Sequence, residues 1–128
     1  MIVLDHNIGE DQAELLRRWR IHFKQIGVDI GRPEWEDFQE IRRHLHRQKQ
    51  AAFFTRDFDF YLPQLCHPNY ALIVLGLPIK ETAVSIKRFL RHPEFKTKAK
   101  RCGKVIRLSP RVISWWELGV ERQQAMLW

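Results

Sequence analysis

Three aspartates of this chain follow two short apolar runs. Asp5 comes directly after residues 1–4, and Asp57 and Asp59 come after residues 51–56. Runs of this length are typical of strands that are buried on both faces of a parallel sheet. Parallel strands end at one edge, and open α/β sheets place their ligand sites at that edge. We therefore expect the three carboxylates to lie close together.

Carboxylates held close together repel one another, and a bound cation relieves this repulsion. Hard oxygen ligands favour Mg²⁺ or Mn²⁺. Such an ion activates a water molecule and offsets the charge of a scissile phosphate, which is the chemistry of phosphodiester hydrolysis. The start of an expected helix supplies a further acidic ligand, Asp37, and the sequence leaves Glu36 and Glu40 open as alternatives.

Each of these acids also has a structural explanation. Asp5 can cap the helix that follows it, and the acids near Asp37 favour a helix N-terminus through the helix dipole. Asp57 and Asp59 can organise a turn. The joint pattern is more specific than any single residue, because three separate strand ends carry an acid.

The wider apolar pattern predicts alternating strands and helices. We expect strands at residues 2–4, 21–28, 51–55, 71–75, 104–108 and 112–116, and helices at about 9–19, 34–49 and 81–90. This alternation favours an α/β fold, a three-layer α/β/α sandwich around a central, mostly parallel sheet. No repeat, low-complexity tract or Gly/Ser-rich linker interrupts the chain, so residues 1–128 are expected to form a single domain.

The positive charge of the chain is concentrated in one segment. The net charge is +7, and residues 80–111 hold 11 basic and 2 acidic side chains, whereas the flanking segments are each slightly acidic. Such a block is typical of a phosphate-binding surface, although a solvated helix face has a similar composition. The candidate nucleic-acid contacts are Arg56, Lys87, Arg88, Arg91, Lys96, Lys98, Lys100 and Arg101.

Two further groups of residues have open roles. His44 and His46 lie in a basic helix and are expected at its surface, with an RNA-contacting face as the alternative. Trp115 and Trp116 are adjacent in an expected strand and so point to opposite faces. One of them is expected in the core, and the other is then placed to stack on a base.

The composition disfavours a membrane or secreted protein. The uncharged apolar stretch at residues 70–79 is too short to cross a bilayer, and the N-terminus shows no basic leader. The two cysteines, Cys66 and Cys102, have no CxxC spacing, and this low cysteine content favours reduced thiols. We therefore expect a cytoplasmic protein with no membrane partner.

Three segments, I-V-L-D-H-N at residues 2–7, E-D-F-Q-E-I at 36–41 and F-F-T-R-D-F-D-F at 53–60, resemble the PIN-like family, in its small prokaryotic branch related to the VapC-type toxins. The resemblance covers roughly residues 1–77 and is strongest over the third segment. It departs at His6, where many members have an acid.

This resemblance implies a ribonuclease that depends on Mg²⁺ or Mn²⁺ and hydrolyses RNA. It implies that Asp5, Asp37 and Asp57 bind the metal, with Asp59 beside them in the catalytic set. It also implies a toxin role with an antitoxin protein as partner, and a homodimer. A non-catalytic nucleic-acid- or protein-binding module of the same fold is the alternative, and His6 favours it.

Overall fold

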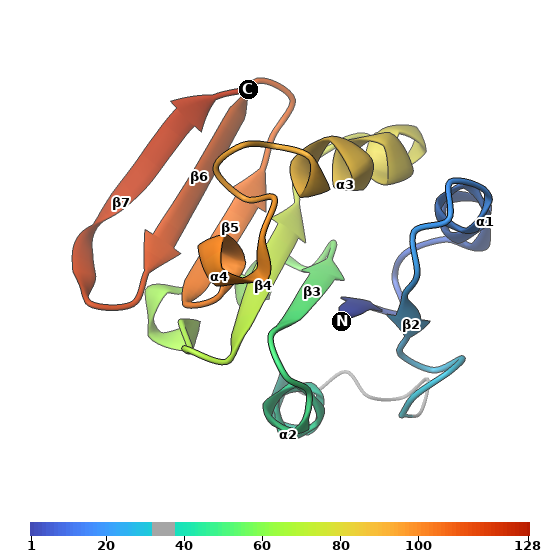
Figure 1. Ribbon diagram of the computed structural model, residues 1–128, viewed down its shortest axis with the longest axis horizontal. Coiled ribbons are helices and arrows are strands. Elements are labelled where there is room, and N and C mark those ends of the chain that lie inside the picture. The colour runs from blue at the N-terminus through green and yellow to red at the C-terminus, as the bar shows by residue number, and fades with distance from the viewer. Residues whose placement is uncertain (32–37) are drawn as a thin grey trace.

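The computed structural model describes residues 1–31 and 38–128, and this part of the chain forms one seven-stranded sheet (Figure 1). The strand order is β2-β1-β3-β4-β5-β6-β7. The first five strands in this order are parallel, and β6 and β7 are antiparallel to their neighbours. The α/β fold with a mostly parallel sheet is thus confirmed. The strands are β1 (Ile2–Leu4), β2 (Lys24–Gln25), β3 (Ala51–Thr55), β4 (Tyr70–Leu75), β5 (Lys104–Leu108), β6 (Val112–Glu117) and β7 (Val120–Leu127).

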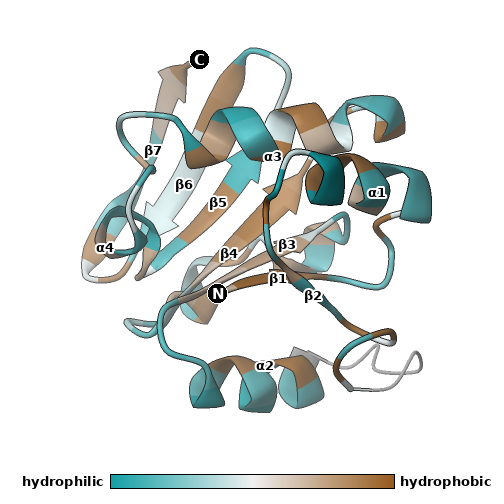
Figure 2. Ribbon diagram, turned by 45° about the vertical axis from the view of Figure 1, so that its right-hand side comes forward, coloured by the Kyte–Doolittle hydropathy of each residue, from teal (hydrophilic) through white to brown (hydrophobic). Residues whose placement is uncertain are grey.

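Helices lie on both faces of the sheet (Figure 2). One face is covered by α1 (Glu10–Arg18) and α3 (Thr82–Leu90), and the other by α2 (Phe38–Arg47). A short helix, α4 (Lys98–Arg101), packs against β3. Three single turns of 3₁₀ helix connect these elements, η1 (Phe58–Phe60), η2 (Pro63–Leu65) and η3 (Ile79–Glu81). None of the helices in the described residues is long and apolar enough to cross a membrane.

Alternation along the central strands divides the core into two parts. In β3, Phe54 packs with the residues of α1 and α3, and Phe53 packs with Ile41 and Leu45 of α2. Every residue of β3 and β4 is buried. Each buried side chain of this size stabilises the fold by about 1.5–3 kcal/mol, so these strands require helices on both faces.

The parallel strands share a carboxyl edge, where they end, and an amino edge, where they begin. Leu4 is level with Phe54 in the pairing of β1 with β3, and Phe54 is level with Ile73 in the pairing of β3 with β4. Asp5 therefore leaves β1 at the carboxyl edge, beside Thr55 at the end of β3. The start of the chain and the residues just before β3 and β5 lie at the amino edge.

The strand expected at residues 21–28 is reduced to Lys24–Gln25. Gly27 adopts a φ of 83°, a left-handed conformation that suits glycine. The backbone N–H of Gln25 donates to Asp29 Oδ2 at 3.0 Å, which closes a tight turn. The apolar residues of this stretch suggested a longer strand, but the turn directs the chain away from the sheet.

The second predicted helix is present at Phe38–Arg47, and its predicted start lies outside the described residues. The helix ends before Lys49, and Gln50 follows with a φ of 56°, which is incompatible with a continuing helix. Two elements had no predicted counterpart, α4 and β7. Four consecutive side chains of β7, at residues 121–124, are polar, and six of its eight residues are exposed, so the strand has little apolar alternation to detect.

Trp115 and Trp116 lie on opposite faces of β6, as predicted. Trp115 packs edge-on against Phe95 on the α3 side, with ring centroids 5.3 Å apart. Trp116 packs against the core on the α2 side. Both rings are partly buried and both contribute to packing.

Candidate active site

A pocket of about 380 Å³ lies at the carboxyl edge of the sheet. Residues that follow β1 and β3 form most of its wall, and one residue of α2 completes it. The lining residues are Asp5, His6, Asn7, Ile41, Asp57, Asp59 and Phe60. The structure thus brings together the three carboxylates that follow the two apolar runs. Among the described residues, neither Lys nor Arg lines the pocket.

Asp5 is the buried member of the three, with only 2% of its surface exposed. Its Oδ1 accepts hydrogen bonds from the backbone N–H and from Nδ1 of His6, both at 2.8 Å. Its Oδ2 accepts from the Thr55 hydroxyl at 2.7 Å and from the Asn7 amide at 3.3 Å. A carboxylate is costly to bury unless such donors stabilise it, so this network is what allows Asp5 to sit inside the protein.

Thr55 joins the two strand ends through its buried hydroxyl. Besides donating to Asp5, the hydroxyl oxygen accepts from the backbone N–H of Asp57 at 3.0 Å and from the Asn7 amide at 3.3 Å. Asn7 in turn accepts from the backbone N–H of Arg56 at 3.2 Å. The loops after β1 and β3 therefore form a single hydrogen-bonded unit.

Asp57 and Asp59 belong to the turn that follows β3. Asp57 Oδ1 accepts from the backbone N–H of Asp59 at 2.9 Å and caps η1. The turn that the sequence allowed as their structural role is therefore present. Within the described residues, the exposed carboxylate of Asp59 has no hydrogen-bond or ion-pair partner, so it is available at the pocket rim.

Gln25 supports the pocket from behind and was not found by sequence reasoning. Its Nε2 donates to the carbonyl oxygens of Asp5 at 3.3 Å and of Ile8 at 2.8 Å. Its Oε1 is buried without a hydrogen-bond partner among the described residues. A strand of two residues carries no periodicity, so nothing in the sequence marked this amide as an anchor for the loop.

The acid predicted on the second helix is not placed in the pocket. Asp37 and Glu36 lie outside the described residues. Glu40 lines a different hollow on the same helix. In the described part of the chain, no three His, Cys, Asp or Glu side chains are close enough to hold a metal ion. The metal site predicted from Asp5, Asp37 and Asp57 stays a prediction.

The chemistry of the pocket fits a hard divalent cation. Its carboxylates are oxygen donors of the kind that Mg²⁺ and Mn²⁺ prefer, and no Lys or Arg of the described residues forms a salt bridge with them. The four acceptor positions of Asp5 are already used. An ion that binds Asp5 must therefore displace one donor, either the long contact from Asn7 or the ring of His6, whose side chain is 39% exposed.

The predicted nucleic-acid contacts do not surround this pocket. Arg56 lies at the carboxyl edge, but its guanidinium donates to the Leu77 carbonyl at 2.8 Å and to the Thr82 hydroxyl at 3.1 Å. It therefore braces the start of α3. The other seven predicted contacts lie on α3 or beyond it, and α3 runs from the carboxyl edge back toward the amino edge.

The two predicted contacts on α3 lie over aromatic rings. Lys87 Nζ is 4.6 Å from the ring centroid of Trp19, and the Arg88 guanidinium is 4.2 Å from that of Trp128. Cation–π contacts of this kind stabilise a fold modestly. These side chains therefore have a packing role at a distance from the pocket.

Arg101 has a structural role, contrary to the prediction that it contacts phosphate. It is only 8% exposed and donates to the Phe95 carbonyl at 3.3 Å, and its burial lowers the pKa of its guanidinium. Burial, then the charges of Lys98 and Arg101, lower the pKa of the Met1 amino group. This places α4 beside the start of β1, at the amino edge.

Comparisons with protein-family models, with curated proteins and with solved structures found no match to this chain. The geometry of the pocket and the three aspartates that follow the two apolar runs are therefore the basis for inferring a function.

Replacing Thr55 with Val keeps the side-chain volume and removes the hydroxyl that serves Asp5. A buried carboxylate then loses a donor, so the free energy of unfolding in urea should fall by about 1–3 kcal/mol. The loss should be smaller in an Asp5→Ala background, where the carboxylate is absent. Equal losses in both backgrounds would show that the hydroxyl acts independently of Asp5.

Proposed function

We propose that this chain is a metal-dependent endoribonuclease with a three-layer, PIN-like fold, which hydrolyses RNA phosphodiester bonds with Mg²⁺ or Mn²⁺. One observation carries the proposal: Asp5, Asp57 and Asp59 follow two adjacent parallel strands and line a pocket that no Lys or Arg of the described residues lines. Carboxylates gathered in this way attract a divalent cation. The resemblance of the same segments to the PIN-like family supports RNA as the substrate.

The residues of the pocket have separable tasks in this reaction. A divalent ion, when bound, supplies an activated water molecule and offsets charge on the phosphate. Asp5 and Asp57 provide carboxylate oxygens that hold the ion, and Thr55 and Asn7 keep Asp5 oriented through their hydrogen bonds. Asp59 has a free carboxylate at the rim and is placed to accept a proton from the attacking water.

Changing Asp57 to Asn keeps the side-chain size and removes one charge of a metal ligand. We expect RNA cleavage to fall about 100-fold or more, and the rise in melting temperature caused by Mn²⁺ to disappear. Without metal, the variant should be at least as stable as the wild type, because carboxylate repulsion is reduced.

The matched control is Glu94→Gln, which removes the same charge from an exposed position outside the pocket. It should leave both measurements unchanged. Full cleavage by the Asp57→Asn protein with Mn²⁺ present would exclude Asp57 as a ligand. The alternative is a binding module without catalysis, and it is favoured by the four hydrogen bonds that already occupy the Asp5 carboxylate. Binding of RNA by the wild type, with no cleavage and no stabilisation by Mn²⁺, would support this alternative.

His6 occupies a position on Asp5 that a metal ion would use. Replacing His6 with Ala removes the 2.8 Å contact from Nδ1 and keeps the contact from the backbone N–H. We therefore expect the affinity for Mn²⁺, measured by calorimetry, to rise about tenfold, because the ion no longer has to displace a hydrogen bond to a charged group, which costs about 1.5 kcal/mol. His22→Ala, at an exposed position outside the pocket, should leave the affinity unchanged. A fall in affinity would identify His6 as a ligand instead of a competitor.

We also propose that the ribonuclease is a toxin whose activity an antitoxin protein restrains. The family resemblance supports this role, and the carboxylates of Asp57 and Asp59 line the pocket where such a partner would bind. An Arg of the partner would bind these carboxylates in place of the cation.

Expression of the chain alone in a bacterium should slow growth, because RNA would be cleaved without restraint. The Asp57→Asn variant at the same protein level should not slow growth. Equal growth rates for the two strains would count against the toxin role.

A further inference from the structure

Basic side chains lie along the outer side of α2, between the acidic pocket and the opposite edge of the sheet. Ile41 lines the pocket, and Arg47 ends the helix shortly before β3 begins at the amino edge. Arg43 and Arg47 are exposed and four residues apart, so they share one side of the helix. With His44 and Glu40, they line a hollow of about 250 Å³. The ten residues of the helix span about 15 Å.

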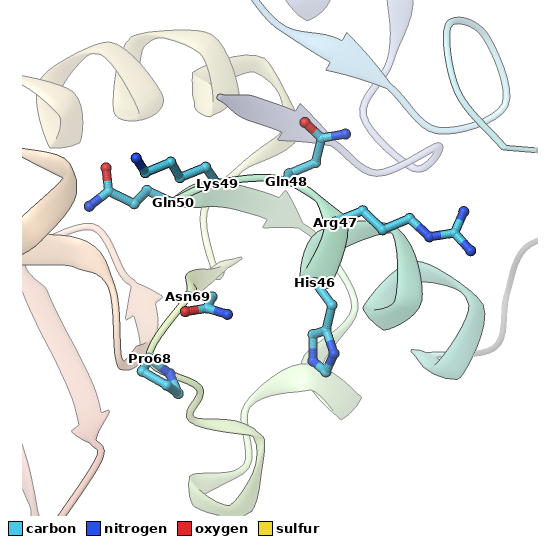
Figure 3. Close-up of a pocket in the computed structure, with 7 residues that line it drawn as sticks. All are labelled: His46, Arg47, Gln48, Lys49, Gln50, Pro68 and Asn69. Atoms are coloured by element: carbon cyan, nitrogen blue, oxygen red, sulfur yellow. The ribbon is translucent and has the colours of Figure 1, made fainter.

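A second hollow, of about 360 Å³, lies where α2 ends. In Figure 3, His46 and Asn69 lie on opposite sides of this hollow, and Lys49 and Gln50 extend from the loop between α2 and β3. The lining combines cations with three amide side chains, and no carboxylate of the described residues lines it. The residues are His46, Arg47, Gln48, Lys49, Gln50, Pro68 and Asn69.

A stack of rings supports His46 in the second hollow. Its ring lies on that of His67, with centroids 4.3 Å apart, and His67 lies on Tyr70 at 4.6 Å. Burial lowers the pKa of His67, and the charges of His46 and Arg42 lower it further. Burial is the larger cause of this shift, and the charges on α2 act in the same direction.

Further cations continue the surface across the amino edge. Lys98 and Lys100 are exposed on α4, which packs against β3. Lys104 begins β5 and pairs weakly with Glu117 at 3.9 Å. Among the described residues, no carboxylate forms a salt bridge with the two lysines of α4 or with the exposed cations at residues 43, 47 and 49.

We propose that an RNA strand leaves the acidic pocket along α2 and crosses the amino edge over this surface, which we call the basic path: Arg43, Arg47, Lys49, Lys98 and Lys100. The inference rests on the proposed function, because it extends the substrate site of the same pocket. Cations spaced in this way neutralise successive phosphates. The amides of the second hollow can hydrogen-bond the exposed base edges of a single strand.

The composition of the basic path favours RNA over an acidic protein as its occupant. Of the large hydrophobic side chains that are exposed in the described residues, none lies on α2, at residues 47–50 or at residues 91–104, and Met1, beside α4 at the amino edge, is 37% exposed. Stable protein interfaces have an apolar, aromatic core. Nucleic-acid interfaces are more polar and strongly positive, as this surface is.

Two variants with the same loss of charge test the basic path. The path variant combines Arg43→Gln, Arg47→Gln and Lys49→Gln, and the control variant combines Arg18→Gln, Lys24→Gln and Arg122→Gln, at exposed positions on α1, β2 and β7. Gln preserves helix propensity, so both variants should keep the wild-type melting temperature. Binding of a labelled single-stranded RNA long enough to span α2 is measured by fluorescence anisotropy in EDTA at several salt concentrations.

The path variant should bind the RNA at least about tenfold more weakly at low salt, and its log–log salt slope should be shallower by about 2, since each phosphate contact on a single strand contributes about 0.7. The control variant should keep the wild-type slope. Equal losses in the two variants, or a wild-type slope near zero, would overturn the proposal. So would tighter binding of a polyglutamate peptide than of RNA, because the surface would then be a protein-docking site.

A cleavage assay separates this inference from the proposed function. With Mn²⁺, the path variant should cleave the long strand poorly and should still cleave an oligonucleotide too short to leave the pocket. If no version of the protein cleaves RNA but the difference in binding persists, the nuclease proposal fails and the RNA-binding surface stands. Undiminished cleavage of the long strand by the path variant would overturn the basic path.

Discussion

The burial of the Asp5 carboxylate is the constraint on which the carboxyl edge of the sheet depends. A buried negative charge needs donors from the protein in place of water, and the chain supplies them from two loops, through His6 and Asn7 after β1 and through Thr55 at the end of β3. An arrangement that satisfies Asp5 therefore also fixes the spacing of the two strand ends. The position of Asp57 follows, because its N–H donates to the same Thr55 hydroxyl.

Among the described residues, no Lys or Arg lines the pocket or forms a salt bridge with its carboxylates. A Lys or Arg that reached Asp5 would pair with it strongly in this poorly solvated position, and would take the place of a divalent ion. Arg56 is adjacent in sequence to both Thr55 and Asp57, yet the Leu77 carbonyl and the Thr82 hydroxyl hold its guanidinium at the start of α3. Exposed cations of the described residues include those along α2 and at the amino edge, and Arg107, whose guanidinium is 5.0 Å from the ring centroid of Phe58.

The sequence predicts the positions of the carboxylates, because each follows a short apolar run that can be recognised locally. The runs before Asp5 and Asp57 mark buried parallel strands, and parallel strands must end at the same edge. No comparable local pattern tells where the basic segments lie in the fold. The segment after residue 80 is the most basic in the sequence, but α3 carries it back toward the amino edge, where Arg101 is buried. The sequence shows that this helix is basic and leaves an RNA-contacting face as the alternative to a plain surface, but acids in the first part of the chain cancel the cations of α2 in a net count.

One helix therefore links two surfaces that the sheet keeps apart. α2 contributes Ile41 to the acidic pocket and Arg47 to the hollow at the amino edge, and Leu45 anchors it to β3 between these two points. The carboxylates depend on strand ends, whose spacing the sheet fixes, whereas the cations depend on the docking of a helix. A shift of α2 would change the shape of the pocket and the position of the basic path together. Substitutions of its outward-facing arginines would change the path alone, because the apolar face that seats the helix would remain intact.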